Sequence, residues 1–267
     1  MGQLVPILPE GAEIRGVTLL AGEIYLLREK ERDQVEVYDV ITYRLQRRLT
    51  VPNAFNFTDM TSCEHNRCVY ISDYNGECVH RQDVQGAVKR WAVNDLPAGL
   101  SVNAVHNVLV TCGCVRKIKE FSSHGHLLRE LTLPDDVIRP RLAIQTRSGQ
   151  FIVCHGGVDP VHRVCMISAD GRHIVHSHGG QPGSDTGQYS VPLHLAVDDN
   201  ESVCVADCGN RRVTLLSPTL KYVGQVVSRD QLRWGRPGRL YLDTQRRHLY
   251  VAEQREYTPG RVAVFSV

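Results

Sequence analysis

The stretch VCVADCGNRRVTLL, residues 203–216, contains residue types that bind metals and carry out redox chemistry. Cys204 and Cys208 are four positions apart, Asp207 precedes the second cysteine, and the pair Arg211–Arg212 follows. A structural zinc site needs four ligands, and redox-active cysteine pairs typically have the spacing CxxC. This stretch has neither pattern. Its role therefore depends on the elements that position it and on the residues that they bring nearby.

The whole set of nine cysteines also argues against a disulfide framework or a metal centre. An odd number cannot be fully paired within one chain, and the gaps between these cysteines are uneven. Most of them lie in apolar runs such as FIVCH and HRVCMI, where a reduced cysteine behaves as a small buried hydrophobic residue. We therefore expect reduced thiols in the core, no bound metal and no other cofactor.

Other catalytic signatures are weak. The segment GRHIVHSHGG places His176 and His178 on one face of a strand, but two ligands are too few for a metal site. The nucleophile pattern GxSxG and the phosphate loop GxxxxGK do not occur in the sequence. These observations favour a binding protein over an enzyme.

Composition narrows the class of protein further. With 42% hydrophobic and 22% charged residues, the 267-residue chain can bury a sizeable core. The formal net charge of +2 gives no strong overall attraction to nucleic acid or membranes. No apolar run approaches the roughly 20 residues that span a bilayer, and the N-terminus lacks a signal-peptide pattern. We expect a soluble, cytoplasmic chain that does not contact membranes and is a monomer as an isolated domain.

Short β-type runs recur along the chain and would position these residues. They are IYLLR, VYISD, VLVTC, FIVCH, VCVAD and LYVAE, starting at residues 24, 69, 108, 151, 203 and 249. A shorter run precedes each of them, and a third and often a fourth run follow, with turn signals between the runs. Four strands in a unit of about 45 residues are typical of a β-propeller blade.

The sequence therefore predicts an all-β fold, a six-bladed β-propeller of four-stranded antiparallel blades, as a single domain over residues 1–267. The approximate blades are 11–51, 52–95, 96–134, 135–180, 181–229 and 230–267 plus 3–8. The last unit ends after RVAVFSV, without an outer strand. We expect the apolar segment QLVPIL to pair beside it and close the ring, which covers an open sheet edge. Pro6 suits an outermost strand, whose free side needs no N–H donor.

The fifth unit has a more specific signature. It contains a glycine-rich turn, a Gly-Gln pair, a proline-led first strand and the hairpin VAD-x-x-N-x-R-V. This pattern resembles the NHL repeat, with its repeat-structural positions at Gly187, Pro192, Asp207, Asn210 and Arg212. Asp207 and Asn210 would tighten the hairpin through hydrogen bonds to nearby backbone groups. The remainder of the chain matches the NHL repeat by period.

The resemblance points to the NHL propellers at the C-terminal end of tripartite-motif proteins. It implies a non-catalytic scaffold for protein–protein interaction, such as substrate recognition for a ubiquitin ligase. The alternative that it implies is an NHL domain that binds single-stranded RNA. Some NHL-like propellers are metal-dependent lyases or hydrolases, so catalysis is a third alternative.

Two rings of equivalent positions are candidates for a site in the channel. The residues nine positions before each second strand are Arg15, Met60, Gly99, Leu142, His194 and Leu240. This ring has one histidine and no carboxylate, so it cannot form a metal cage. The residues at the second-strand ends are Arg28, Asp73, Cys112, His155, Asp207 and Glu253. The carboxylates of this second ring could hold a cation, although we favour the interpretation that they orient turns.

Basic pairs indicate where a partner would bind. Arg116–Lys117 and Arg211–Arg212 fall at equivalent places, in the turn between second and third strands, and should share one rim. The binding-face candidates are these four residues together with Asp73, His155, Asp207 and Glu253. The balanced charge and the 6% content of aromatic residues favour a protein partner over RNA, which is commonly stacked on aromatic side chains.

Overall fold

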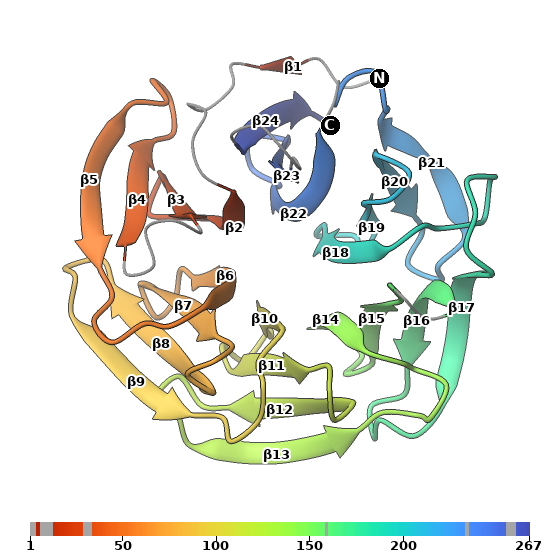
Figure 1. The fold of residues 1–267 in the computed structure, drawn as a ribbon, viewed down its shortest axis with the longest axis horizontal. Coiled ribbons are helices and arrows are strands. Elements are labelled where there is room, and N and C mark those ends of the chain that lie inside the picture. The colour runs from red at the N-terminus through yellow and green to blue at the C-terminus, as the bar shows by residue number, and fades with distance from the viewer. Residues whose placement is uncertain (1–3, 6–12, 29–33, 158–159, 233–234, 255–259) are drawn as a thin grey trace.

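The computed structural model of the chain consists of six four-stranded antiparallel sheets arranged as blades around a central axis (Figure 1). The structure describes residues 4–5, 13–28, 34–157, 160–232, 235–254 and 260–267. Within these ranges every regular element is a strand. The predicted all-β, six-bladed propeller is therefore confirmed. Among the same residues there is no helix long and apolar enough to cross a membrane.

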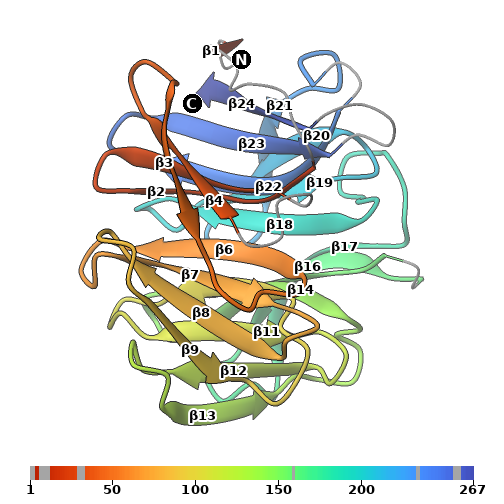
Figure 2. The ribbon, with the colours of Figure 1, turned by 60° about the vertical axis from the view of Figure 1, so that its left-hand side comes forward.

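In five blades, four consecutive strands pair in chain order from the channel outwards, as Figure 2 shows for β6 to β9. Blade 1 contains β2 (Ile14–Leu20), β3 (Glu23–Arg28), β4 (Gln34–Asp39) and β5 (Leu45–Thr50). Blade 2 contains β6 (Phe57–Cys63), β7 (Cys68–Asp73), β8 (Cys78–Asp83) and β9 (Val88–Ala92). Blade 3 contains β10 (Gly99–Val102), β11 (Val108–Cys112), β12 (Lys117–Phe121) and β13 (Leu127–Thr132).

The remaining blades follow the same plan. Blade 4 contains β14 (Pro140–Gln145), β15 (Phe151–His155), β16 (His162–Ile167) and β17 (Ile174–Gly180). Blade 5 contains β18 (Pro192–Val197), β19 (Val203–Asp207), β20 (Arg212–Leu216) and β21 (Tyr222–Val227). Blade 6 contains β22 (Arg236–Asp243), β23 (His248–Gln254), β24 (Arg261–Ser266) and the N-terminal β1 (Leu4–Val5).

The core lies between neighbouring blades. One cluster joins Leu142, Ile152 and Val164 of blade 4 to Leu195 and Val205 of blade 5. Neighbouring sheets cover second strands such as β7 on both faces, so every residue of β7 is buried. The outer strands β5 and β13 instead alternate between exposed and partly buried positions. This difference explains why the second strands form continuous apolar runs in the sequence, which made the repeat visible.

The N-terminal segment closes the ring. Leu4 lies opposite Phe265 and Val5 lies opposite Val264 in an antiparallel pairing of β1 with β24. The strand order of blade 6 is therefore β1-β24-β23-β22 (Figure 1). The predicted closure is confirmed for residues 4–5, while Gln3 and residues 6–8 lie outside the described ranges.

The register of the first strands corrects one expectation. The residues that lie level with one another beside the channel are Gly16, Asp59, Gly99, Leu142, His194 and Arg239. The expected ring was right for blades 3, 4 and 5 but was displaced by one residue in blades 1, 2 and 6. A count of nine residues assumes first hairpins of equal length. From the channel residue to its partner in the second strand the chain advances 12 positions in blades 3, 4 and 5 (99 to 111, 142 to 154, 194 to 206), 11 in blade 1 (16 to 27) and 13 in blades 2 and 6 (59 to 72, 239 to 252).

Candidate binding face and channel mouth

The residues that end the second strands lie on one face of the disc, which we call the strand-end face. All six are buried: Arg28, Asp73, Cys112, His155, Asp207 and Glu253. Four of them were predicted as binding-face candidates, and none of these four side chains presents a surface to solvent. Each makes polar contacts with nearby side chains, which shows what holds them in place.

Asp207 is the centre of a hydrogen-bonded turn. Its carboxylate accepts hydrogen bonds from the Ser190 backbone N–H (2.8 Å), Asn210 Nδ2 (2.8 Å) and Arg212 Nε (2.7 Å). Arg212 also donates to three backbone carbonyls in the loop 184–188. Burial raises the pKa of Asp207, although these hydrogen bonds and the positive charge of Arg212 oppose the shift. Asp207 and Arg212 therefore hold the loop that enters blade 5.

The other repeat-structural residues act in the same loop. Gly187 has a φ of 89°, a left-handed conformation that favours glycine. Pro192 begins β18 directly opposite Asp207, and Asn210 Nδ2 donates to the Gly183 carbonyl at 2.8 Å. Similar contacts recur in three blades: Arg261–Glu253 at 2.7 Å, Arg163–His155 at 2.9 Å and Arg28–Glu36 at 2.6 Å. These polar side chains orient hairpins, as the interpretation that we favoured states.

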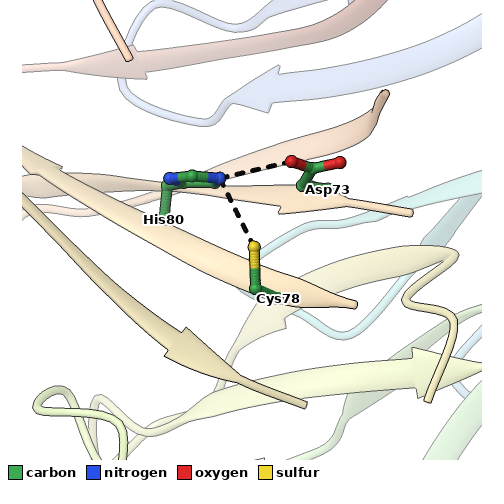
Figure 3. A group of neighbouring side chains, drawn as sticks. All are labelled: Asp73, Cys78 and His80. Atoms are coloured by element: carbon green, nitrogen blue, oxygen red, sulfur yellow. Dashed lines mark hydrogen bonds and ion pairs between the residues drawn. The ribbon is translucent and has the colours of Figure 1, made fainter. Parts of the chain in front are cut away.

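Blade 2 departs from this pattern because Cys78 takes the place that Arg212 has in blade 5. Asp73, Cys78 and His80 bring an oxygen, a sulfur and a nitrogen within 4.8 Å of one another (Figure 3). His80 Nε2 lies 3.5 Å from Asp73 Oδ2 and 3.4 Å from Cys78 Sγ. Within the described ranges, this is the one group of three side chains that could hold a metal ion.

The chemistry of the group does not fit zinc. The carboxylate of Asp73 already accepts three backbone N–H groups, and Arg90 Nε brings a positive charge 3.1 Å from Cys78 Sγ. Burial raises the pKa of Cys78 and lowers the pKa of His80, so both are neutral near pH 7. His80 Nδ1 is buried without a described partner, whereas a zinc-bound histidine normally donates through its second nitrogen. A structural zinc site needs a fourth protein ligand, and a catalytic one needs a position open to water or substrate. This group of three buried residues has neither.

Of the four rim candidates, Arg116 and Arg211 lie in the turns between second and third strands, whereas Lys117 and Arg212 begin the third strands β12 and β20. Arg116 and Arg211 have left-handed φ values of 53° and 56° at matching places in the second hairpins of blades 3 and 5. Arg116 pairs with Asp135 at 2.8 Å, and Lys117 pairs with Glu130 at 3.1 Å. Because Arg212 is engaged in the turn of blade 5, this rim offers less free positive charge than its sequence suggested.

A polar cluster that the sequence analysis missed crosses the channel. Asp59 of blade 2 lies 3.4 Å from His194 Nε2 of blade 5 and 3.2 Å from Arg239 Nε of blade 6. Asp59 Oδ2 accepts the Leu100 backbone N–H at 2.8 Å, and Arg239 donates to the Thr58 carbonyl. Although burial opposes it, the charges of His194 and Arg239 hold the pKa of Asp59 below its usual value.

Two adjoining pockets lie at this mouth of the channel. The inner pocket, about 250 Å³, is lined by Arg15, Arg141, His194 and Arg239 among others. The outer pocket, about 470 Å³, lies over blades 2 to 4 and includes Arg139 and Arg141. Both pockets include Tyr74, Ala98 and Arg141. Among the described side chains, Arg139 and Arg141 make no hydrogen bond or ion pair to another residue.

A different alignment of the sequence could have found this cluster. A proline begins the first strand in blades 4 and 5, at Pro140 and Pro192, and Pro237 is the second residue of β22. Two positions after each proline stand Leu142, His194 and Arg239, which are the residues level beside the channel. An alignment on these prolines absorbs the unequal hairpin lengths, and would have placed Arg239 beside the channel.

The cysteines, Cys204 and Cys208 among them, are mostly core thiols. All nine are unpaired, and eight are buried, as expected of core thiols. Burial raises the pKa of Cys204 to about 12 and that of Cys208 to about 11. The exposed exception is Cys114, which lies in the outer pocket with its Sγ 3.4 Å from Tyr74 Oη.

Comparison with known proteins extends the description of the fold. No protein-family model and no curated protein matches the sequence. A streptogramin B lyase structure is similar, with a TM-score of 0.69 and 10% identity over 100% of this chain and 87% of that one. A catalytically inactive virginiamycin B lyase variant from Staphylococcus aureus with quinupristin has the same TM-score and identity, covering 100% and 99%. Hydrazine synthase of Kuenenia stuttgartiensis has a TM-score of 0.66 and 13% identity over 95% and 98%.

These identities are low, so the similarity establishes the fold and does not assign an activity. By fold, the chain is a six-bladed β-propeller with four-stranded antiparallel blades. The solved structures named here are lyase and synthase propellers. The finer resemblance to the NHL repeats of tripartite-motif proteins therefore stays a prediction.

Proposed function

We propose that the chain is a non-catalytic binding propeller whose strand-end face docks an acidic segment of a protein partner. The observation that carries this proposal is the position of Arg139 and Arg141 beside a pocket of about 470 Å³. Neither guanidinium has an ion-pair partner among the described residues. Unpaired positive charge beside a concave surface attracts and orients an acidic partner.

The surrounding charges support the same site. On the rim, Asp135 pairs with Arg116 and Asp136 pairs with Arg163, so these acidic residues are already neutralised. The uncompensated positive charge is thus concentrated near the channel mouth. An acidic segment over the outer pocket could therefore contact Arg139 without repulsion from an unpaired carboxylate of Asp135 or Asp136.

The wider setting of the proposal follows the NHL resemblance. We propose a monomeric module of the cytoplasm, and nine unpaired cysteines fit a reducing compartment. One role that the resemblance implies is recognition of substrates for a ubiquitin ligase. Single-stranded RNA is the second candidate ligand, supported by the basic residues Arg116, Lys117 and Arg211 on the same face.

A metal-dependent lyase or hydrolase is the third candidate. The similarity to lyase propellers and the contact between Asp59 and His194 in the channel favour it. Against it, no trio of metal-ligating side chains occurs at the mouth within the part of the chain that the structure describes. Binding therefore ranks above catalysis.

A peptide-display selection tests the docking proposal. Wild-type protein is expected to enrich peptides rich in Asp and Glu, because the outer pocket supplies unpaired arginines. The substitution Arg139→Glu should lower the affinity for the enriched peptides by about tenfold or more, since it places a negative charge beside the acidic peptide. The matched control is Arg172→Glu, which reverses an exposed arginine in the turn after β16, on the opposite face. Failure to enrich acidic peptides, or equal losses in both variants, would refute the proposal.

A further inference from the structure

The inner pocket of the channel mouth is lined by N–H donors of His194 and Arg239 that share a single carboxylate oxygen. His194 Nδ1 accepts the Leu240 backbone N–H at 3.3 Å, so the ring N–H on Nε2 is the one that faces Asp59. His194 Nε2 and Arg239 Nε both pair with one oxygen, Asp59 Oδ1, at 3.4 Å and 3.2 Å, without the geometry of a hydrogen bond. The exposed fraction of both residues is only 8%. A buried donor whose acceptor is poorly aligned leaves stabilisation to be gained from a bound group that accepts from it.

Arg141 adds a further donor to the same pocket. Its Nε is buried without a described hydrogen-bond partner, and its side chain lines both the inner and the outer pocket. Arg15, which also lines the inner pocket, pairs with Glu13 at 3.3 Å. The single carboxylate at the floor is Asp59. Positive charge from Arg141 and Arg239 therefore exceeds the negative charge of the described lining residues.

Hydrogen bonds hold the side chains at the floor of the pocket. Asp59 Oδ2 is held by the Leu100 backbone N–H, and Arg239 is held by the carbonyls of Thr58 and Gly238. Asp59 and Arg239 line the inner pocket but not a second cavity of about 260 Å³, which His194 and Leu240 line further along the channel. A ligand therefore reaches the donors from the strand-end face.

We propose that the inner pocket binds a small oxyanion, a carboxylate or a phosphate. The guanidinium of Arg141, Arg239 Nε and His194 Nε2 donate to its oxygens. Arginine suits this role because its planar group binds carboxylate and phosphate through two parallel hydrogen bonds. The oxyanion belongs either to a free small molecule or to an acidic residue of a docked peptide. The site does not depend on the docking proposal.

Thermal unfolding with inorganic phosphate or succinate tests the site, with sodium chloride at matched ionic strength as the reference. Both anions are expected to raise the melting temperature above that reference, because they bind the folded state alone. Arg141→Gln should weaken this binding about tenfold or more, since hydrogen bonds to charged groups are strong. The control Arg172→Gln removes one exposed charge from the opposite face and should retain it.

Nuclear magnetic resonance of the wild type gives a readout that needs no variant. Titration with phosphate or succinate should shift the imidazole signals of His194 and leave those of His173, in an exposed turn, unchanged. If an acidic peptide shifts His194 while free anions do not, the oxyanion is a side chain of the partner. If free anions shift it while no peptide binds, the site stands and the docking proposal fails. If neither ligand shifts His194 and the anions stabilise no more than chloride, the proposed site is wrong.

Discussion

Replacing Arg212 by methionine is expected to lower the free energy of unfolding by about 3 kcal/mol, because it leaves a buried carboxylate without its cation. Asp207 is fully buried, and Arg212 Nε lies 2.7 Å from it. The variant also loses the hydrogen bonds from Arg212 to the loop 184–188. Chemical denaturation of the two proteins measures the difference. A variant as stable as the wild type would contradict the structural role of Arg212.

The loss should depend on pH in a defined direction. Burial already raises the pKa of Asp207, and removing the positive charge of Arg212 raises it further. The folded variant then binds a proton more tightly than the unfolded chain, so stability is lost as pH rises through the raised pKa. The destabilisation should shrink as pH falls from about 8 towards 4. The double variant Asp207→Asn/Arg212→Met is the control, since it has no buried charge at this position and should lose less than Arg212→Met alone.

Deleting residues 1–9 is expected to lower stability by several kcal/mol and to promote self-association. β24 pairs with β1 on one side and β23 on the other, so the deletion turns β24 into an open edge. Unpaired backbone groups of such an edge pair readily with another chain. Denaturation and sedimentation measure the two effects.

A synthetic peptide of residues 1–9 supplies the control for this deletion. Added in excess, it should restore stability by binding the folded truncated protein. A truncated protein that melts like the wild type and stays monomeric would show that closure by β1 contributes little.

The fold could be predicted because second strands such as VCVAD are buried on both faces and form apolar runs at a regular spacing. The position of the channel residues could not, because the first hairpins differ in length. The first hairpin spans 11 positions in blade 1 (16 to 27) and 13 in blades 2 and 6 (59 to 72, 239 to 252), which displaced the count at Gly16, Asp59 and Arg239. A displacement of one residue along a strand moves a side chain to the other face.

The candidate site was partly predictable for a related reason. The hairpin pattern picked out Asp207, Asn210 and Arg212 as repeat-structural positions, and in the structure Asn210 and Arg212 donate to the carboxylate of Asp207. The sequence could not show that these residues lie in the interior. Charged residues are mostly found at the surface and are buried only when paired, and the sequence alone does not reveal the pairing. Arg139 and Arg141 were missed because they lie in blade 4, away from the matching hairpin turns of blades 3 and 5.

The most direct test of the proposed protein-docking function compares two binding measurements. One uses the peptides enriched by display, and the other uses a random pool of single-stranded RNA. Both are measured at physiological salt with wild-type protein and with Arg116→Ala/Arg211→Ala. The account predicts tight peptide binding, weak RNA binding and no enriched RNA motif. Submicromolar, sequence-selective RNA binding that this double variant abolishes would contradict it. In that case about four phosphate contacts would give a slope of log affinity against log salt near −3.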